Sequence, residues 1–222
     1  MTYTFTYLKL GRNLRILCLV LATVVLPSIA VADDAHDFFL AISFDNAYSV
    51  RNSLSHGLDP NLKEAIHGDP GLVFALREKA MKAFDVLLNA PKIDLEARAQ
   101  NGDTALMVAS YMANKSAVIA LLDKDAEVNK TGWTALHYAA SSGDCDIIKL
   151  LLDKSAYIDA ESPNKTTPIM MAARGGQMAA VKLLIEEGAD IGLKNEQGMT
   201  AADFAIAHEF NDIADLLKSV KH

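Results

Sequence analysis

Cysteine is nearly absent from this chain of 222 residues, which contains only Cys18 and Cys145. Cys18 lies among the first 32 residues, which we expect to be removed as a leader, so the remaining chain would keep one cysteine and could not form an internal disulfide. Small exported domains often depend on disulfides for stability. This chain is expected to be held together by packing alone.

Carboxylates are missing from the first 32 residues, which carry three basic side chains, Lys9, Arg12 and Arg15. An apolar run over residues 16–26 follows, and the small residues Ala30 and Ala32 come after it. This order is typical of a secretory signal peptide, residues 1–32, with cleavage between Ala32 and Asp33. The alternative is an uncleaved membrane anchor, for which residues 16–32 lie at the short limit of a bilayer span.

Positive charge is scarce in the rest of the chain. Three of the 21 Lys and Arg residues lie in the leader, which leaves 18 against 28 Asp and Glu residues, a net charge of about −10 after leader removal. Such a surface repels phosphate backbones and anionic headgroups. We therefore expect no nucleic-acid partner, and no membrane association once the leader is removed.

What the chain does contain is a repeat. A hexapeptide that begins with threonine recurs at residues 104–109, 134–139, 167–172 and 200–205. Each copy is followed by an apolar pair such as Leu151-Leu152, and divergent copies precede them at residues 70–75 and 36–41. A sequence that repeats at such regular intervals indicates stacked supersecondary units. The units run over residues 36–69, 70–103, 104–133, 134–166, 167–199 and 200–222.

Each unit predicts two short helices. In residues 134–166, Thr134 is a good N-cap, and Leu136 and Ala139 fall on one helix face. Gly143 ends this helix, and a second amphipathic helix follows, whose buried face includes Ile147 and Leu151. Helices this short are unstable alone in water, so the units must bury their apolar faces against one another in a linear stack.

The chain resembles the ankyrin-repeat family. The family pattern Gly-x-Thr-Pro-Leu-His-x-Ala-Ala-x-x-Gly matches residues 132–143 except at Ala135, and residues 188–190 match the repeat ending Gly-Ala-Asp. The resemblance implies an all-α fold over residues 33–222, an ankyrin-repeat solenoid of about six helix–turn–helix units with finger loops. Asp125 and Ser155 replace the glycine that ends the second helix in the left-handed conformation. The 104–133 unit is about three residues short, so we expect a stunted finger loop there.

Groups for catalysis or metal binding do not form a recognisable motif in the sequence. Cys145 and His137 share a unit, but the resemblance makes His137 a structural histidine, and a buried cysteine behaves as a small apolar residue. The other histidines are scattered over different units without metal-ligand spacing. We therefore predict no enzyme activity, no catalytic residue, no cofactor and no metal. A hydrolase with an unrecognised site is the remote alternative.

Partner binding is the function that the resemblance implies, through a concave groove lined by finger tips and by the exposed ends of the first helices. Carried over by position, the groove residues are Asn101, Asp103, Tyr111, Met112, Trp133, Ser141, Ser142, Asn164, Thr166, Arg174, Glu196, Gln197, Met199 and His208. Trp133 either binds the partner or packs over the shortened finger. We expect a monomer that binds another protein in a bacterial periplasm, with secretion as the alternative compartment. A second hypothesis is a protective partner that stabilises an exported enzyme.

Overall fold

The computed structural model describes residues 34–220, so the predicted signal peptide and its cleavage site at Ala32 lie outside the described residues. Regular structure in this range is helical, apart from one isolated bridge between Lys63 and Pro70. Residues 34–43 are helical and precede the labelled helices. These are α2 (Ala47–Ser55), α3 (Gly71–Arg77), α4 (Met81–Leu88), α5 (Ala105–Tyr111), α6 (Lys115–Leu122), α7 (Ala135–Ser142), α8 (Cys145–Asp153), α9 (Pro168–Arg174), α10 (Met178–Glu186), α11 (Ala201–Ala207) and α12 (Asn211–Ser219).

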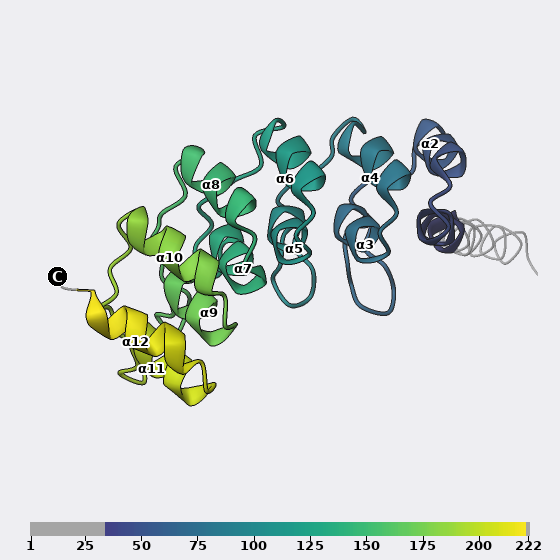
Figure 1. Ribbon diagram of the computed structural model, residues 1–222. Helices are drawn as coiled ribbons and strands as arrows, with labels where there is room; N and C mark the ends of the chain where they lie inside the picture. Colours follow the sequence, from purple (N-terminus) through teal and green to yellow (C-terminus); the bar gives the residue numbers. More distant parts are fainter. Residues whose placement is uncertain (1–33, 221–222) are drawn as a thin grey trace, which may run out of the picture.

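The helices form two rows along a curved stack (Figure 1). Helices α3, α5, α7, α9 and α11 form the inner row, and α4, α6, α8 and α10 run along the outer side of the curve. Within the inner row α5 packs on α7 and α7 on α9, while in the outer row α6 packs on α8 and α8 on α10. The predicted all-α repeat solenoid is confirmed.

One apolar core runs through the stack. Leu106, Leu136 and Ile169 occupy the same place on successive inner helices, and each is at most 1% exposed. Leu121 and Leu151 do the same on the outer helices. Burial of one such side chain stabilises the fold by about 1.5–3 kcal/mol. Because each side chain packs against the neighbouring unit, helices of seven to nine residues are stable in the stack although they would not be stable alone.

Four inner helices begin in the same way. Each N-cap is a threonine in extended conformation, at Thr104, Thr134, Thr167 and Thr200. Its backbone N–H donates to the side chain three residues later: Met107 Sδ at 3.4 Å, His137 Nδ1 at 3.1 Å, Met170 Sδ at 3.4 Å and Asp203 Oδ2 at 2.8 Å. A thioether, an imidazole or a carboxylate can therefore act as the acceptor at the third position after the threonine cap.

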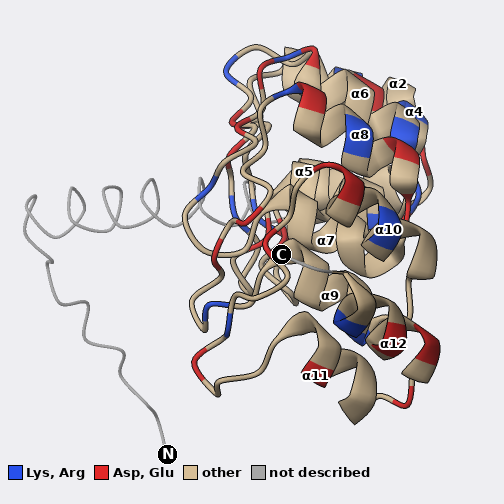
Figure 2. Ribbon diagram, turned by 60° about the vertical axis from the view of Figure 1, so that its left-hand side comes forward, with Lys and Arg blue, Asp and Glu red and all other residues tan. Residues whose placement is uncertain are grey.

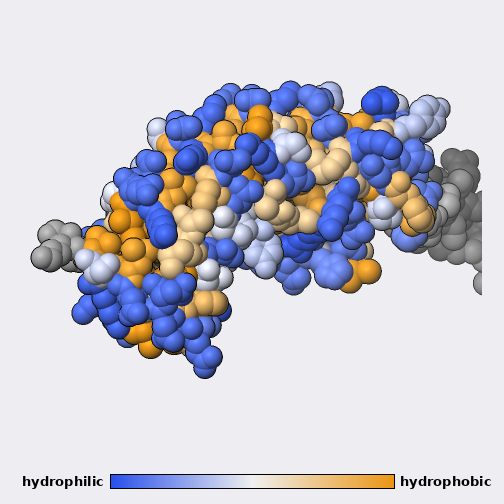
Figure 3. Space-filling model, in the orientation of Figure 1, coloured by the Kyte–Doolittle hydropathy of each residue, from blue (hydrophilic) through white to orange (hydrophobic). Residues whose placement is uncertain are grey.

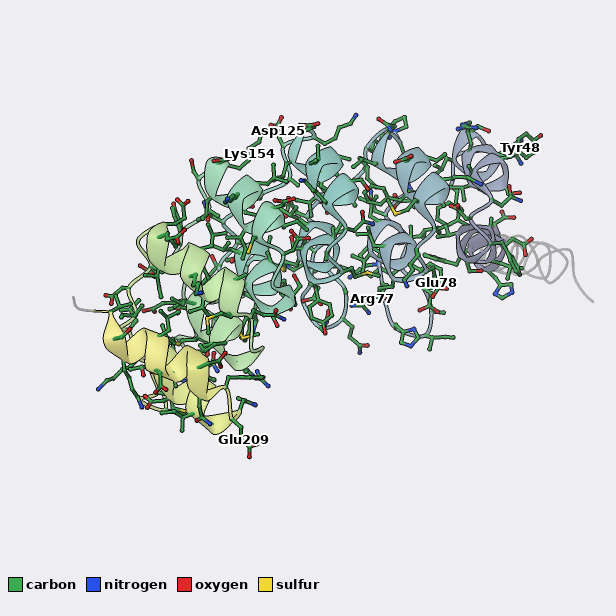
Figure 4. All side chains as sticks on the ribbon, in the orientation of Figure 1. Tyr48, Arg77, Glu78, Asp125, Lys154 and Glu209 are labelled. Carbon is green, nitrogen blue, oxygen red and sulfur yellow. The ribbon has the colours of Figure 1, made fainter. Side chains whose placement is uncertain are left out.

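Left-handed residues end the outer helices. Asp125 has φ of 62° and Ser155 has φ of 64°, which confirms that they replace glycine in the left-handed conformation. Figure 4 shows Asp125 at the outer edge of the stack. A non-glycine residue in this conformation costs about 1–2 kcal/mol. Between α9 and α10, Gly176 has φ of 69°, and a Cβ there would lie 2.5 Å from the Phe210 ring, so only glycine fits.

The shortened finger has its own stabilising contacts. Neighbouring fingers are closed by a backbone hydrogen bond, such as Ser162 N–H to Thr166 O at 3.0 Å. Within the described residues no backbone hydrogen bond closes residues 127–133. Instead Lys130 Nζ pairs with Glu127 at 2.7 Å and with Glu96 of the preceding unit at 3.2 Å. Because this finger is about three residues shorter than its neighbours, it lacks their closing backbone hydrogen bond. The ion pairs of Lys130 hold it in place instead.

Candidate functional site

The two groups that most resemble a catalytic pair are not placed to react. His137 is fully buried, and its ring nitrogens bind Thr134 N–H at 3.1 Å and Thr166 O at 2.8 Å. Burial lowers its pKa from 6.5 to about 4, so the ring is neutral near pH 7. Burial also raises the pKa of Cys145, with a further contribution from Asp144, which keeps the thiol protonated. With both ring nitrogens of His137 bound and the pKa of the Cys145 thiol raised, neither group has the features of an activated base or nucleophile.

A metal-binding cluster and a membrane-spanning helix are both absent from the described part of the chain. Residues 34–220 hold no group of three His, Cys, Asp or Glu side chains able to bind a metal ion. None of the helices in this range is both long and apolar enough to cross a bilayer.

The surface of the stack mixes charged and apolar residues. Figure 2 shows Lys, Arg, Asp and Glu interspersed over the loops and outer helices. Hydrophobic residues are visible on one face as strips bordered by hydrophilic ones (Figure 3).

An aromatic cluster lies on the inner helices α5 and α7. Tyr111 is 59% exposed, and its ring meets the ring of Tyr138 edge to face with centroids 6.1 Å apart. The Tyr138 hydroxyl donates to the carboxylate of Asp103 in a preceding finger. Burial and this carboxylate both raise the pKa of Tyr138, so its hydroxyl stays protonated and its ring is fixed in place.

Beside this cluster lies a small depression, which we call the Trp133 pocket. It has a volume of about 180 Å³ and is lined by Trp133, His137, Tyr138, Met171 and Arg174. The Trp133 ring is half-buried and packs edge to face on His137, with centroids 5.2 Å apart. Trp133 therefore packs over its finger and also presents part of its ring to the solvent.

A polar network lies toward the amino-terminal end of the same surface. Arg77 Nη1 pairs with Asp69 at 2.9 Å, and Arg77 Nη2 lies 3.7 Å from Asp103. Asn101 Nδ2 donates to Asp103 Oδ2 at 2.6 Å. Figure 4 shows Arg77 near the end of α3, on the inner side of the stack. Burial raises the pKa of Asp69, and the neighbouring guanidinium opposes that rise. The network links two successive units, 36–69 and 70–103.

The structure places most of the predicted groove residues at least partly in solvent. The exposed or half-buried ones are Asn101, Tyr111, Met112, Trp133, Ser141, Ser142, Asn164, Arg174, Glu196, Gln197, Met199 and His208. Trp133 and Arg174, predicted from different units, come together in the Trp133 pocket. Glu196, Gln197 and His208 do not contribute to that pocket.

Two predicted contact residues are corrected by the structure. Asp103 is 7% exposed because its carboxylate accepts from Tyr138 and Asn101 and faces Arg77. Thr166 is 2% exposed because its backbone binds the imidazole of His137 and the hydroxyl of Ser162. Both residues hold their fingers in place and are not available to a partner.

Three residues of this surface were not predicted: Arg77, Tyr138 and Met171. Tyr138 and Met171 directly follow the acceptors His137 and Met170, so they hold the same repeat position. Arg77 occupies in its unit the place of Arg174, at the last residue of an inner helix. All three residues could therefore have been predicted from their positions in the repeat.

Comparison with known proteins agrees with the repeat fold. The family model described as Ankyrin repeats (3 copies) matches residues 38–130, 72–162 and 157–221. The chain is 29% identical over 162 residues to the human transient receptor potential cation channel subfamily A member 1, which covers 68% of the chain. It is 29% identical over 153 residues to the mouse B-cell lymphoma 3 protein homolog, which covers 66% of the chain.

These relatives are much longer than the matched region. The chain spans 14% of the channel subunit and 34% of the B-cell lymphoma 3 homolog. It is also 37% identical over 105 residues to the human ankyrin repeat and KH domain-containing protein 1, of which it spans 4%. The similarity thus concerns the repeat stack that these proteins share.

Proposed function

The chain belongs to the ankyrin-repeat family, and we propose that it is a non-catalytic, monomeric binding protein that holds a partner protein against its inner surface. Ankyrin repeats imply a protein–protein interaction module. The observation that carries the proposal for this chain is the Trp133 pocket with the exposed Tyr111 beside it. Fold alone does not fix a function, so the argument rests on this surface.

The residue types on this surface favour a protein partner. Trp, Tyr and Arg are enriched at the centres of protein interfaces, where each supplies a large contact area. Here they come from three successive units, so that one partner segment can contact all of them. Tyr138 is bound to Asp103 and Trp133 packs on His137, so two of the rings are already ordered. Ordered side chains lower the entropy lost on binding.

The state of His137 and Cys145 supports a non-catalytic role. A general base needs a free lone pair within reach of a substrate, and both nitrogens of His137 are engaged inside the fold. A nucleophilic cysteine needs a lowered pKa, and that of Cys145 is raised. A binding role therefore fits the state of these two residues better than hydrolysis does.

We also propose that the protein acts outside the cytoplasm, in a bacterial periplasm. The support is the basic start, apolar run and small-residue ending of residues 1–32. Expression of the full chain with a carboxy-terminal tag in a Gram-negative host tests this directly. An intact mass that begins at Asp33, recovered from the periplasmic fraction, is the expected result. A membrane fraction that retains residues 1–32 would contradict it.

The binding proposal is tested by quantitative capture with matched tyrosine variants. The tagged protein is cross-linked lightly in the periplasmic fraction, and co-purified proteins are compared between wild type, Tyr111→Ser and Tyr157→Ser. Tyr157 is 68% exposed, as open as Tyr111, but lies in the loop after α8. We expect the partner to be lost with Tyr111→Ser and retained with Tyr157→Ser. Equal recovery with both variants would show that the inner surface is not the binding site.

A further inference from the structure

The Trp133 pocket has room for one side chain. Its volume is about 180 Å³, whereas pockets for drug-sized ligands and cofactors usually measure about 300–1,000 Å³. An occupant of this size must be held mainly by contacts made outside the pocket. A side chain that projects from a longer peptide segment satisfies this condition.

Most of the pocket wall is apolar in its chemistry. The His137 ring is neutral, and neither of its nitrogens is free to bind a ligand. The Tyr138 hydroxyl is used by Asp103, so only the ring is available. Met171 adds a half-buried thioether. An apolar side chain can therefore enter without leaving a buried polar group of the wall unsatisfied.

The remaining polar groups at the pocket are donors. Among residues 34–220, no Asp or Glu forms an ion pair with Arg174, which is exposed at the last residue of α9. Arg77, at the same position of α3, differs because Asp69 lies 2.9 Å away. No hydrogen bond joins the Trp133 indole N–H to an acceptor in this part of the chain. A guanidinium group binds carboxylates strongly through paired hydrogen bonds.

We propose that the Trp133 pocket receives an apolar side chain from a partner segment whose neighbouring carboxylate pairs with Arg174. This inference rests on the proposed binding function and specifies its ligand as a peptide that combines one apolar and one acidic residue. The rest of the chain is acidic and repels such a segment. Arg174 therefore supplies selectivity, since an acidic peptide is attracted at this place and repelled at most others.

The test uses a phage library of random heptapeptides selected against the purified protein without its leader. We expect enriched peptides to carry Asp or Glu within two positions of a Leu, Ile, Met or Phe. A selected peptide, made synthetically, should change the fluorescence of Trp133, the only tryptophan in the chain. Its Kd should rise by about tenfold or more in Arg174→Gln. Lys182→Gln on α10 removes an equal charge elsewhere and should leave the Kd within about twofold.

The outcomes separate this inference from the broader proposal. Enriched peptides without the apolar–acidic pairing, the absence of any enriched peptide, or an unchanged Kd in Arg174→Gln would overturn the inference. If binding falls with Tyr111→Ser while Arg174→Gln binds normally, the inner surface remains the binding site but the carboxylate pairing is wrong. If both variants bind like wild type, the proposed function fails as well. Circular dichroism of each variant checks that its fold is intact.

Discussion

Replacement of His137 by methionine tests how the inner helices are capped. Met107 and Met170 already accept the N-cap N–H through sulfur at 3.4 Å in their own units. A methionine at position 137 is therefore expected to keep the bond from Thr134. It loses the second bond of the imidazole, which joins Nε2 to Thr166 O at 2.8 Å.

The loss of stability at neutral pH can be estimated from these contacts. Loss of one hydrogen bond destabilises a protein by about 1 kcal/mol, so His137→Met should lower the free energy of unfolding by that amount near pH 7.5. His137→Ala should cost about 3 kcal/mol or more. It removes a fully buried ring and leaves the buried Thr134 N–H without its acceptor at position 137.

The pH dependence gives a sharper result. Burial lowers the pKa of His137 in the folded protein to about 4, below the ordinary value of 6.5. As pH falls through 6.5 the unfolded chain binds a proton that the folded protein does not, so His137 makes the fold less stable between pH 6.5 and 4. At pH 5 the loss is about 2 kcal/mol. Methionine does not titrate, so the variant should equal wild type in stability at about pH 6 and exceed it by about 1 kcal/mol at pH 5.

Urea unfolding monitored by circular dichroism, repeated between pH 5 and 8, measures these differences. The other titrating groups are shared by the two proteins, so the difference between the curves isolates His137. The reasoning is refuted if the two stabilities do not cross in this range. It is also refuted if His137→Met is as unstable as His137→Ala at pH 7.5, since a thioether would then not replace the imidazole as acceptor.

Further substitutions probe three other features of the fold. Asp125→Gly and Ser155→Gly should each raise the free energy of unfolding by about 0.5–1 kcal/mol by relieving left-handed strain, and a lower thermal midpoint would contradict this. Gly176→Ala should cost about 2–3 kcal/mol because its methyl group meets an aromatic ring, while Gly188→Ala, which has open space, should cost about 1 kcal/mol; equal urea midpoints would disprove the clash. Lys130→Met should lower stability by about 1 kcal/mol and speed proteolysis within residues 126–133, and an unchanged cleavage rate would show that the ion pairs do not hold this finger.

The repeat stack was predictable because its determinants are local and periodic. Each threonine cap stands 16 or 17 residues before an apolar pair, so one well-formed unit identifies its neighbours. In the same register Asp125 and Ser155 hold the repeat position of Gly188, whose φ is 92°. The register therefore predicted their left-handed conformation. Short-range spacing was sufficient for these features.

Burial within the groove was not predictable in the same way. Asp103, Trp133, Thr166 and Met199 all directly precede a threonine cap, yet Asp103 and Thr166 are buried while the other two are half-buried. The difference comes from distant partners, because Asp103 binds a tyrosine 35 residues away and Thr166 binds a histidine 29 residues away. Repeat position alone does not specify such contacts.

Site-specific photo-cross-linking tests the central claim, that the inner surface holds a partner protein, most directly. A benzophenone amino acid replaces Tyr111 in one protein and Tyr157 in another, since both positions are well exposed. The account predicts that illumination in the periplasm joins one partner to position 111 in high yield and leaves position 157 nearly unlabelled. The opposite pattern, or equal labelling of the same partner at both positions, would contradict the assignment of the inner surface.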